Sequence, residues 1–276
     1  MASPQPTASD TDTDSLRRHL VSSGLAGDVA TTVDNCLDNI GRLLAGRAGY
    51  TFGLSDWKRA TFHDVVAAMR AAGGRPDGPA NADGGAFIDP DAALGAIAHQ
   101  RSVLTRLRTA GTGRVLVATG HPFALLAHYG AVARALTAAG ITVLRPLEGA
   151  GPKLTTAGGR PCSLRYLDGV ATVFQGVALH HTHHSHYMEA MLAEVGGPAR
   201  VDLVVADHGF AGAAIEAGIP TLAIADVNDL ALPLAQARGR AEGVLVLDDG
   251  LDASSFVPVT EAILGISRGG PGPEPR

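Results

Sequence analysis

The sequence predicts an α/β fold, a Rossmann-like three-layer sandwich with a mostly parallel sheet and an N-terminal helical layer. Two short apolar runs, Val201–Ala206 and Thr221–Ala225, flank a helix-length segment, Gly209–Gly218, whose last glycine suits a helix C-cap. Strand, helix and strand at this spacing indicate a βαβ unit with parallel strands. Continuous apolar runs of this kind are typical of parallel strands that are buried on both faces.

Polar residues follow both of these predicted strands. Asp207 and His208 come after the first strand, and Asp226 and Asp229 come after the second. In an open α/β sheet, ligands bind outside the carboxyl ends of the strands. A single aspartate here is equally typical of a helix N-cap. Two in succession, one of them followed by His-Gly, favour a functional site.

The composition is that of a compact globular protein. Of 276 residues, 46% are hydrophobic and 18% are charged, and there are 35 glycines. A net charge of −5 argues against non-specific nucleic-acid binding, which needs clustered Lys and Arg. The two cysteines, Cys36 and Cys162, are far apart, so neither a disulfide framework nor a cysteine-type zinc site is indicated.

The sequence shows no targeting or membrane segment. It has no run of about 18 apolar residues that could span a bilayer, and its polar start lacks the Lys and Arg of a signal peptide. We therefore expect a cytoplasmic protein that binds no membrane. A homo-oligomer is compatible with the sequence.

We expect four regions along the chain. Residues 1–14 and 268–276 are polar or Gly/Pro-rich and should be disordered tails. Residues 15–112 should form a helical region that packs on the core or caps it, and residues 113–267 should form the α/β domain. Within the helical region we expect helices over 15–47 (broken near Gly24–Gly27), 56–72 and 90–109, loops over 48–56 and 73–88, and no strand before residue 114.

In the α/β domain, the apolar patterns alternate between strands and helices. Strands are expected over 114–118, 141–144, 201–206, 221–225 and 244–247, and helices over 123–139, 185–195, 209–218, 230–240 and 255–266. Two further strands, 163–168 and 170–174, are joined by Asp168-Gly169, which is a strong hairpin signal.

A histidine run occupies residues 180–186 and contains five of the protein's eleven histidines. Imidazoles at this density can bind a metal or hold an anion. Residues that alternate along an extended chain share one face, so His181 and His183 are candidate ligands. The other interpretation is a polar loop in which some histidines only cap the following helix.

Two further segments could bind phosphate. Thr119-Gly120-His121-Pro122 lies between a predicted strand and a predicted helix, where free amides and the helix dipole attract anions. Lys153 and Arg160, in the Gly-rich loop 148–161, could bind phosphate oxygens, although a solvated surface loop is equally typical. No Gly-x-Gly-x-x-Gly or Walker motif occurs, so NAD and ATP are poorly supported.

Four short motifs follow one another along the chain: Thr119-Gly120-His121-Pro122, Thr182 within a His-Thr-His stretch, Asp207-His208-Gly209, and Ala225-Asp226 with Asp229 after it. In this ordering the chain resembles an actinobacterial family named simply phosphatase, over about residues 15 to 267. The histidine run is longer than that family's. The resemblance implies a phosphomonoesterase that acts on a small metabolite, and it assigns no catalytic residues.

The leading hypothesis is metal-assisted hydrolysis of a small metabolite's phosphate monoester, such as a sugar phosphate or nucleotide. The cofactor would be a divalent ion, Mg, Mn, Zn or Fe. The candidates are Asp207, His208 and His121 for catalysis, Thr119, Gly120, Lys153 and Arg160 for substrate binding, and His181, His183, Asp207 and Asp226 for metal binding. The alternatives are a lyase or isomerase that uses His/Asp acid–base chemistry, and a non-catalytic protein that binds a metal or metabolite.

Overall fold

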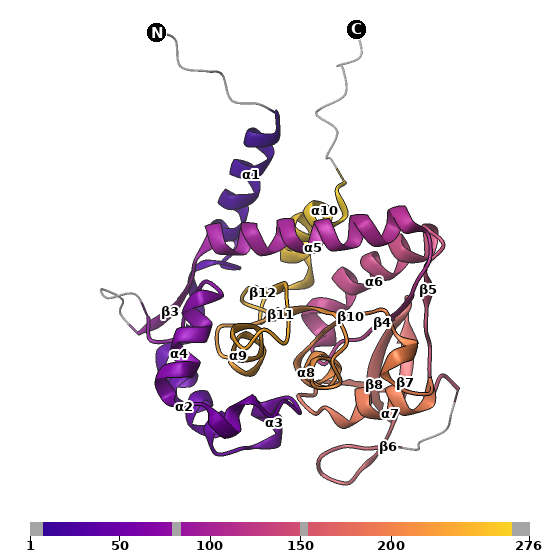
Figure 1. Ribbon diagram of the computed structural model, residues 1–276. Helices are drawn as coiled ribbons and strands as arrows, with labels where there is room; N and C mark the ends of the chain where they lie inside the picture. Colours follow the sequence, from indigo (N-terminus) through magenta and orange to yellow (C-terminus); the bar gives the residue numbers. More distant parts are fainter. Residues whose placement is uncertain (1–7, 79–83, 150–153, 267–276) are drawn as a thin grey trace, which may run out of the picture.

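A five-stranded parallel sheet forms the centre of the protein (Figure 1). The computed structural model describes residues 8–78, 84–149 and 154–266. The strands lie in the order β12-β11-β10-β4-β5. Their bounds are β4 Arg114–Val117, β5 Thr142–Val143, β10 Leu203–Asp207, β11 Thr221–Ala225 and β12 Val244–Val246. The predictions of an α/β fold and of a parallel sheet are confirmed.

The strand order places a topological switch point between β4 and β10. From β4 the chain moves outward to β5, and it later returns to the other side of β4 to add β10, β11 and β12 in turn. At such a point, the loops after the two neighbouring strands lead in opposite directions and leave a crevice at the carboxyl edge. The parallel register pairs Val117 with Val205, so the turn after β4 lies beside Asp207.

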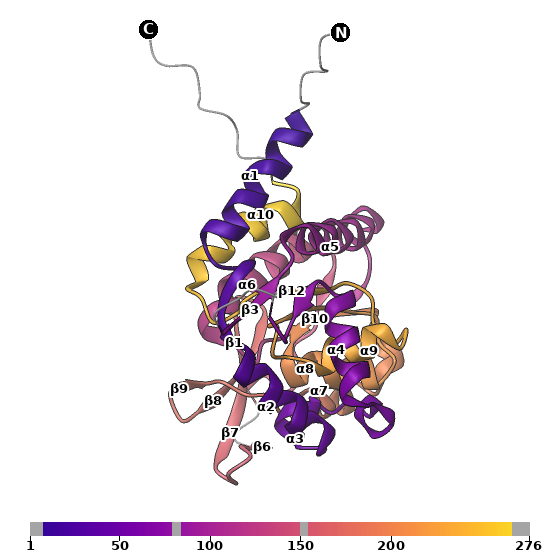
Figure 2. The same cartoon turned by 90° about the vertical axis from the view of Figure 1, so that its left-hand side faces the viewer.

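Helices pack against the parallel sheet from two sides. In Figures 1 and 2, α5, α6 and α10 lie above the sheet, and α8 and α9 lie below it. The bounds are α5 Pro90–Ala110, α6 Pro122–Ala138, α7 His186–Glu194, α8 His208–Glu216, α9 Ala231–Ala237 and α10 Val257–Leu264, with short 3-10 helices at Pro198–Arg200 and Ala253–Phe256. No helix in the described ranges is long and apolar enough to cross a membrane.

An antiparallel sheet interrupts the α/β pattern, as the hairpin signal predicts. It has the order β6-β7-β8-β9, with β6 Leu154–Thr155, β7 Pro161–Leu167, β8 Val170–Gln175 and β9 Ala178–His180. Asp168 and Gly169 both have positive φ, 55° and 86°, as a two-residue hairpin turn requires. The amide of Thr119 donates to the carbonyl of Ala171, so this sheet is fixed to the turn after β4. The histidine run continues directly from β9.

The N-terminal region contains strands that the sequence did not predict. The bounds are α1 Ala8–Ser22, β1 Gly27–Thr32, α2 Val33–Leu44, α3 Ala48–Thr51, a 3-10 helix Asp56–Arg59, α4 Phe62–Ala71, β2 Gly74–Arg75 and β3 Gly85–Ile88. The expectation of no strand before residue 114 is wrong, because β1, β3 and β2 form an antiparallel sheet. These strands are short and bounded by glycines, so they leave almost no apolar alternation in the sequence.

Three smaller corrections concern the same region. The loops expected over 48–56 and 73–88 contain α3 in the first and the two strands β2 and β3 in the second. The tail expected over 1–14 is helical from Ala8, where α1 begins. The rest of that expectation, residues 1–7, and the tail expected over 268–276 lie outside the described residues.

The first strand of the N-terminal region lies over the carboxyl edge of the parallel sheet. The hydroxyl of Thr31 donates to Asp226, and the amide of Ala30 donates to the side chain of Asp248. The amide of Asp248 in turn donates to the carbonyl of Leu25. The N-terminal region therefore covers the edge at which a ligand of this sheet would bind.

One buried titratable group should make the stability of the fold depend on pH. His128, on α6, is 3% exposed, and its Nδ1 lies 2.8 Å from the hydroxyl oxygen of Thr260. That hydroxyl donates its hydrogen to the carbonyl of Phe256, so Nδ1 of His128 must be the donor. Burial lowers the pKa of His128 to about 4.

We expect the free energy of unfolding to fall as the pH falls from about 6.5 to 4. The unfolded chain binds a proton at this histidine in that range while the folded chain does not, at a cost of roughly 3 kcal/mol. Chemical denaturation across this range measures the loss. His128→Gln cannot titrate at this position. Its free energy of unfolding should therefore fall by roughly 3 kcal/mol less over the same pH range. An equal slope in both proteins would contradict the assignment.

Candidate active site

Three neighbouring strands each end in a pair of polar residues at the carboxyl edge. The pairs are Asp207 and His208 at the end of β10, Asp226 and Asp229 after β11, and Asp248 and Asp249 after β12. All six are less than 9% exposed. In each pair, the first residue binds the surrounding loops and the second points toward a common centre.

The first residue of the β10 pair fixes the turn after β4. Asp207 accepts a hydrogen bond of 2.5 Å from the hydroxyl of Thr119 and one of 2.6 Å from the amide of Gly120. The Thr119 hydroxyl also accepts from the amide of His121, at 3.0 Å. The turn Thr119-Gly120-His121 is therefore organised around the carboxylate of Asp207.

The first residues of the other two pairs fix the N-terminal strand. Asp226 accepts from the hydroxyl of Thr31 at 2.7 Å and from the amide of Val227 at 2.6 Å. Asp248 accepts from the amides of Ala30 and Gly250, at 3.2 and 2.9 Å. Strand β1 is thus tied to the ends of both β11 and β12.

The second residues converge. Nε2 of His208 lies 3.1 Å from Oδ2 of Asp229 and 3.4 Å from Oδ2 of Asp249. Oδ2 of Asp249 also lies 3.1 Å from Nδ1 of His121. Within the described residues, no Lys or Arg forms an ion pair with these two carboxylates. These residues, His121, His208, Asp229 and Asp249, form what we call the centre. Its negative charge can be balanced only by histidine protons or by a bound cation.

The pKa shifts report the same negative potential. Burial by itself disfavours the charged form of His208, yet Asp229, Asp249 and Asp207 raise its pKa well above the ordinary value. Burial likewise opposes the charge of Asp249, but His121 and His208 hold its pKa below the usual range. Burial and the charges of Asp249 and Asp229 raise the pKa of Asp226 well above normal. A site that stabilises a protonated imidazole in this way also attracts a metal cation.

His208 has an unusual backbone conformation. Its φ is +43°, in the left-handed region that residues other than glycine rarely adopt. Strain of this kind costs of order 1–3 kcal/mol and is concentrated at functional sites. The next residue is Gly209, where a Cβ atom would lie 2.3 Å from the backbone of His184. Gly209 thus leaves room for the histidine run to approach.

Some histidines of the run lie at the centre, and others lie outside it. The ring of His181 stacks on those of His121 and His208, with centroids 4.5 and 5.3 Å apart. His183 lies 4.3 Å from His208 by the same measure. As their alternation predicts, His181 and His183 come together, with their Nε2 atoms 2.9 Å apart. His186 turns away and contacts the carbonyl of Thr155.

The hydrogen bonds of His183 determine where its ring protons lie. Nδ1 of His183 is 3.0 Å from the carbonyl of Gly49, which can only accept, so Nδ1 is the donor. Burial and the charge of His208 lower the pKa of His183, so its Nε2 keeps a lone pair. A backbone carbonyl that holds the second ring nitrogen is typical of metal-binding histidines and of the residues that support them.

Two overlapping sets of side chains could hold a metal ion. One is His121, His181 and His208, and the other is His208, Asp229 and Asp249. In each set, the potential ligand atoms lie within 4.8 Å of one another. Nδ1 of His121, Nδ1 of His208 and Oδ2 of Asp249 are buried without a well-formed hydrogen bond. Buried polar atoms normally have partners, so this donor set fits a divalent ion.

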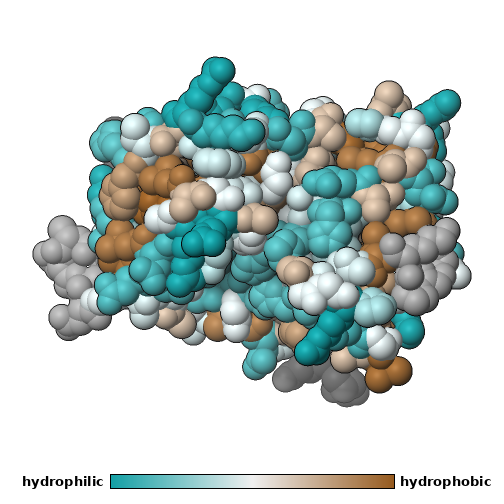
Figure 3. All heavy atoms as spheres, turned by 90° about the horizontal axis from the view of Figure 1, so that it is seen from below, coloured by the Kyte–Doolittle hydropathy of each residue, from teal (hydrophilic) through white to brown (hydrophobic). Residues whose placement is uncertain are grey.

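A pocket of about 650 Å³ adjoins this centre. It is lined by Gly49, Tyr50, residues 156–158, Arg160, Gln175 and residues 180–184. His181 and His183 belong both to the pocket wall and to the centre. The face that carries α3 and β6 is hydrophilic over most of its middle (Figure 3). A polar substrate could therefore reach the centre from this side.

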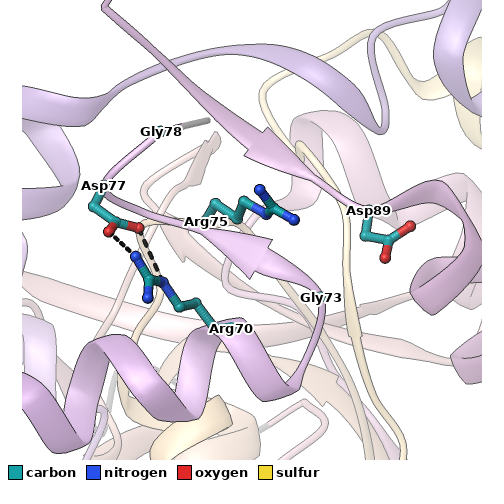
Figure 4. A pocket seen from close by; sticks show the side chains of 6 residues that line it. All are labelled: Arg70, Gly73, Arg75, Asp77, Gly78 and Asp89. Atoms are coloured by element: carbon teal, nitrogen blue, oxygen red, sulfur yellow. Dashed lines mark hydrogen bonds and ion pairs between the residues drawn. The ribbon is translucent and has the colours of Figure 1, made fainter. Parts of the chain in front are cut away.

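A second pocket, of about 500 Å³, lies in the N-terminal region between α4, β2 and the start of α5. Arg70 and Asp77 face each other there as an ion pair, and Arg75 lies between them and Asp89 (Figure 4). None of its described lining residues is a histidine or a cysteine. The candidate active site remains the His/Asp cluster at the carboxyl edge of the parallel sheet.

The predicted site residues do not all lie in one place. His121, His208 and His181 lie in the centre, and Arg160 lines the adjoining pocket. Asp207 and Asp226 lie at the edge, but they bind loops and belong to neither metal-binding set. Lys153 lies outside the described residues.

The expected phosphate cradle at Thr119 and Gly120 is not formed. The hydroxyl of Thr119 and the amide of Gly120 both donate to Asp207, so neither is free to bind a phosphate. The prediction assumed that the amides of this turn face solvent, whereas Thr119 is fully buried.

Sequence reasoning missed Asp249. A signal was available, because Asp248-Asp249-Gly250 directly follows the buried run Val244–Leu247. The argument that selected Asp207 and Asp226 applies equally to this third strand end.

Gly120→Ala is expected to lower turnover about 100-fold, the scale of a misplacement of about 1 Å. A Cβ at this position would lie 2.2 Å from the carbonyl oxygen of Thr182, so the histidine run must shift. The matched control is Gly95→Ala on α5, where the added Cβ meets nothing within 4 Å. Turnover and thermal melting of both variants test this. Normal turnover in folded Gly120→Ala would show that the position of the run does not matter.

The fold and the site together define an α/β protein with a His/Asp cluster at its topological switch point, suited to bind a cation and an anionic substrate. The chain belongs to the Phosphatase family, whose model matches residues 11–269. It is therefore a hydrolase that acts on phosphate, and the predicted resemblance is confirmed. It is 37% identical over 255 residues to Phosphatase SCO2771 of Streptomyces coelicolor, a match that covers 90% of this chain and 94% of that protein. No solved structure matches the chain at a significant level.

Proposed function

We propose that this phosphatase hydrolyses the phosphate monoester of a small metabolite at a divalent-metal centre, on a Rossmann-like three-layer fold. The observation that carries the proposal is the convergence of His208, Asp229 and Asp249 with no Lys or Arg partner in the described chain. Orphaned buried ligand atoms at the same point support it. The helices above and below the parallel sheet support the fold assignment (Figure 1).

We assign the metal-binding role to His208, Asp229 and Asp249, with His181 beside them. The carboxylates, and imidazoles that release their proton when the ion binds, suit Mg, Mn, Zn or Fe. His183 keeps His181 in place through the contact between their Nε2 atoms. Asp207, Asp226 and Asp248 hold the loops that carry these groups, and so are positioning residues.

Hydrolysis requires an activated water, charge neutralisation and a proton for the leaving oxygen. A bound divalent ion supplies the first two, because it lowers the pKa of water and offsets the phosphoryl charge. We assign the proton to His121. Its side chain is 15% exposed, and its Nδ1 lies 3.1 Å from Oδ2 of Asp249; burial opposes the charge of the ring, and Asp249 raises its pKa. Arg160 and the adjoining pocket bind the rest of the substrate.

Phosphate release from a panel of sugar phosphates and nucleotides, carried out in ¹⁸O-labelled water, tests the proposal. Attack of water at phosphorus places one labelled oxygen in the released phosphate. An elimination reaction would release unlabelled phosphate, and an isomerisation would release none. Unlabelled phosphate, or no phosphate from any ester in the presence of divalent ions, would contradict the proposed reaction.

A further inference from the structure

We propose that the substrate carries a second anionic group, a carboxylate or another phosphate, which Arg160 binds in the pocket beside the metal centre. This inference rests on the proposed function, because it specifies the substrate class of the same site. Three features of the pocket carry it: the lack of acidic side chains among its described lining residues, the guanidinium of Arg160, which has no carboxylate partner in the described ranges, and the additional hydrogen-bond donors.

The pocket and the metal centre have opposite chemical character, although His181 and His183 line both. The centre is built around buried aspartates. The pocket has no Asp or Glu among its described lining residues, which instead supply one guanidinium, four imidazoles, an amide and a phenol. A volume of about 650 Å³ is more than a phosphoryl group alone would fill, and it falls in the usual range for small-molecule sites.

Arg160 is presented by a tightly closed turn between β6 and β7. The amide of Thr156 donates to the carbonyl of Arg160 at 2.8 Å, and the amide of Arg160 donates to the hydroxyl of Thr156 at 3.2 Å. The same strand is fixed to the histidine run, because Nε2 of His186 lies 2.9 Å from the carbonyl of Thr155. The backbone of Arg160 is therefore held in place relative to the site.

The guanidinium of Arg160 has no carboxylate partner in the described part of the chain. Other arginines do: Arg145 pairs with Glu148, and Arg240 pairs with Asp56. A guanidinium presents several N–H donors in one plane and binds a carboxylate or phosphate through two of them at once. Among the described residues, Arg160 therefore has no carboxylate partner and the pocket has no acidic lining, which makes the pocket complementary to such an anion.

Tyr50 offers a further donor. Its hydroxyl oxygen accepts a hydrogen bond of 2.5 Å from Nη1 of Arg42, whose guanidinium also lies over the Tyr50 ring. Because arginine can only donate, the hydroxyl hydrogen of Tyr50 remains available for a ligand. With the side-chain amide of Gln175, the pocket can supply donors around an anion that Arg160 binds.

The test compares phenyl phosphate with 4-carboxyphenyl phosphate and with 1,4-phenylene bisphosphate, in the metal-loaded enzyme. We expect kcat/KM to be at least tenfold higher for one or both of the charged esters, mainly through KM. Arg160→Gln should abolish this preference, so that kcat/KM for the charged esters falls to the value for phenyl phosphate. Arg200→Gln, an exposed arginine outside the pocket, is the matched control and should keep the preference. The carboxylate and phosphate arms show which group is bound.

Calorimetry separates failure of this inference from failure of the proposed function. If no ester is hydrolysed, binding of 3-phosphonopropionate is compared with that of butylphosphonate, which lacks the carboxylate. Tighter binding of 3-phosphonopropionate that disappears in Arg160→Gln supports the pocket assignment even without hydrolysis. Equal binding of the two phosphonates, or an equal preference in the wild type and in Arg160→Gln, overturns it.

Discussion

Asp249→Asn is expected to remove the bound metal and to lower phosphate release by at least ~1,000-fold, since a catalytic metal supplies several kcal/mol of transition-state stabilisation. The Asp249 carboxylate faces both His208 and His121, at 3.4 and 3.1 Å. Asparagine has the same shape, but it lacks the charge that draws a cation and that raises the pKa of His121. Metal content, turnover and thermal melting are the measurements.

The neighbouring residue provides the control. Asp248→Asn changes the same side chain one position earlier, where the carboxylate accepts from the amides of Ala30 and Gly250. This variant should keep its metal and most of its turnover and lose about 1–3 kcal/mol of stability, the usual cost of a buried donor left without its acceptor. If the two variants lost metal and activity equally, the distinction between the first and second residues of each pair would be wrong.

His208→Asn is expected to have an effect of similar size, at least ~1,000-fold on turnover, because His208 belongs to both metal-binding sets. Asparagine tolerates the left-handed φ of +43°, because its short polar side chain can form local hydrogen bonds. Its side chain is too short to reach Asp229 and Asp249 as the imidazole does. The variant should therefore lose metal and activity, and it should also melt at a lower temperature, because the buried carboxylates of Asp229 and Asp249 lose the imidazole that faces them.

Normal turnover in folded His208→Asn would exclude His208 from the centre. A variant that fails to fold would be replaced by His208→Gln, which retains a side-chain donor of greater reach. Metal content of this second variant then decides the role of the imidazole.

The apolar runs themselves encode the sheet edge at which the His/Asp cluster lies, so the sequence could predict that edge. Val201–Ala206 and Thr221–Ala225 are continuous, buried and parallel, and polar residues follow them directly. This local signal was sufficient to select His208. The alternation of His181 and His183 was sufficient to predict that their side chains lie on the same face. The strand order explains the position of His121, because β4 and β10 are neighbours and the turn after β4 therefore lies beside Asp207.

The roles of individual residues could not be predicted in the same way. Asp207 and Asp226 are indistinguishable from ligands in sequence, and only the positions of Thr119 and Thr31 show that they accept hydrogen bonds from loops. Gly120 and Gly209 look like anion-binding glycines, yet the backbone of the histidine run packs against both. These contacts join segments that lie more than 20 residues apart along the chain, and no local pattern encodes them.

The N-terminal strands were missed for a related reason. Strand β1 pairs with β3 about 60 residues further along the chain, and each strand contributes few apolar residues to the core. These strands matter for the candidate site, since the amide of Ala30 and the hydroxyl of Thr31 on β1 bind Asp248 and Asp226. The N-terminal region is therefore part of the site's support as well as its cover.

Metal content measured together with phosphate release tests the central claim most directly. The protein, freed of any affinity tag, is stripped with a chelator and then titrated with a single divalent ion. We expect at least one bound ion per chain, no activity in the stripped protein, and activity that returns in proportion to the bound ion. Asp249→Asn should neither bind the ion nor recover. Full phosphate release by the stripped protein in the presence of chelator would contradict a metal centre at His208, Asp229 and Asp249.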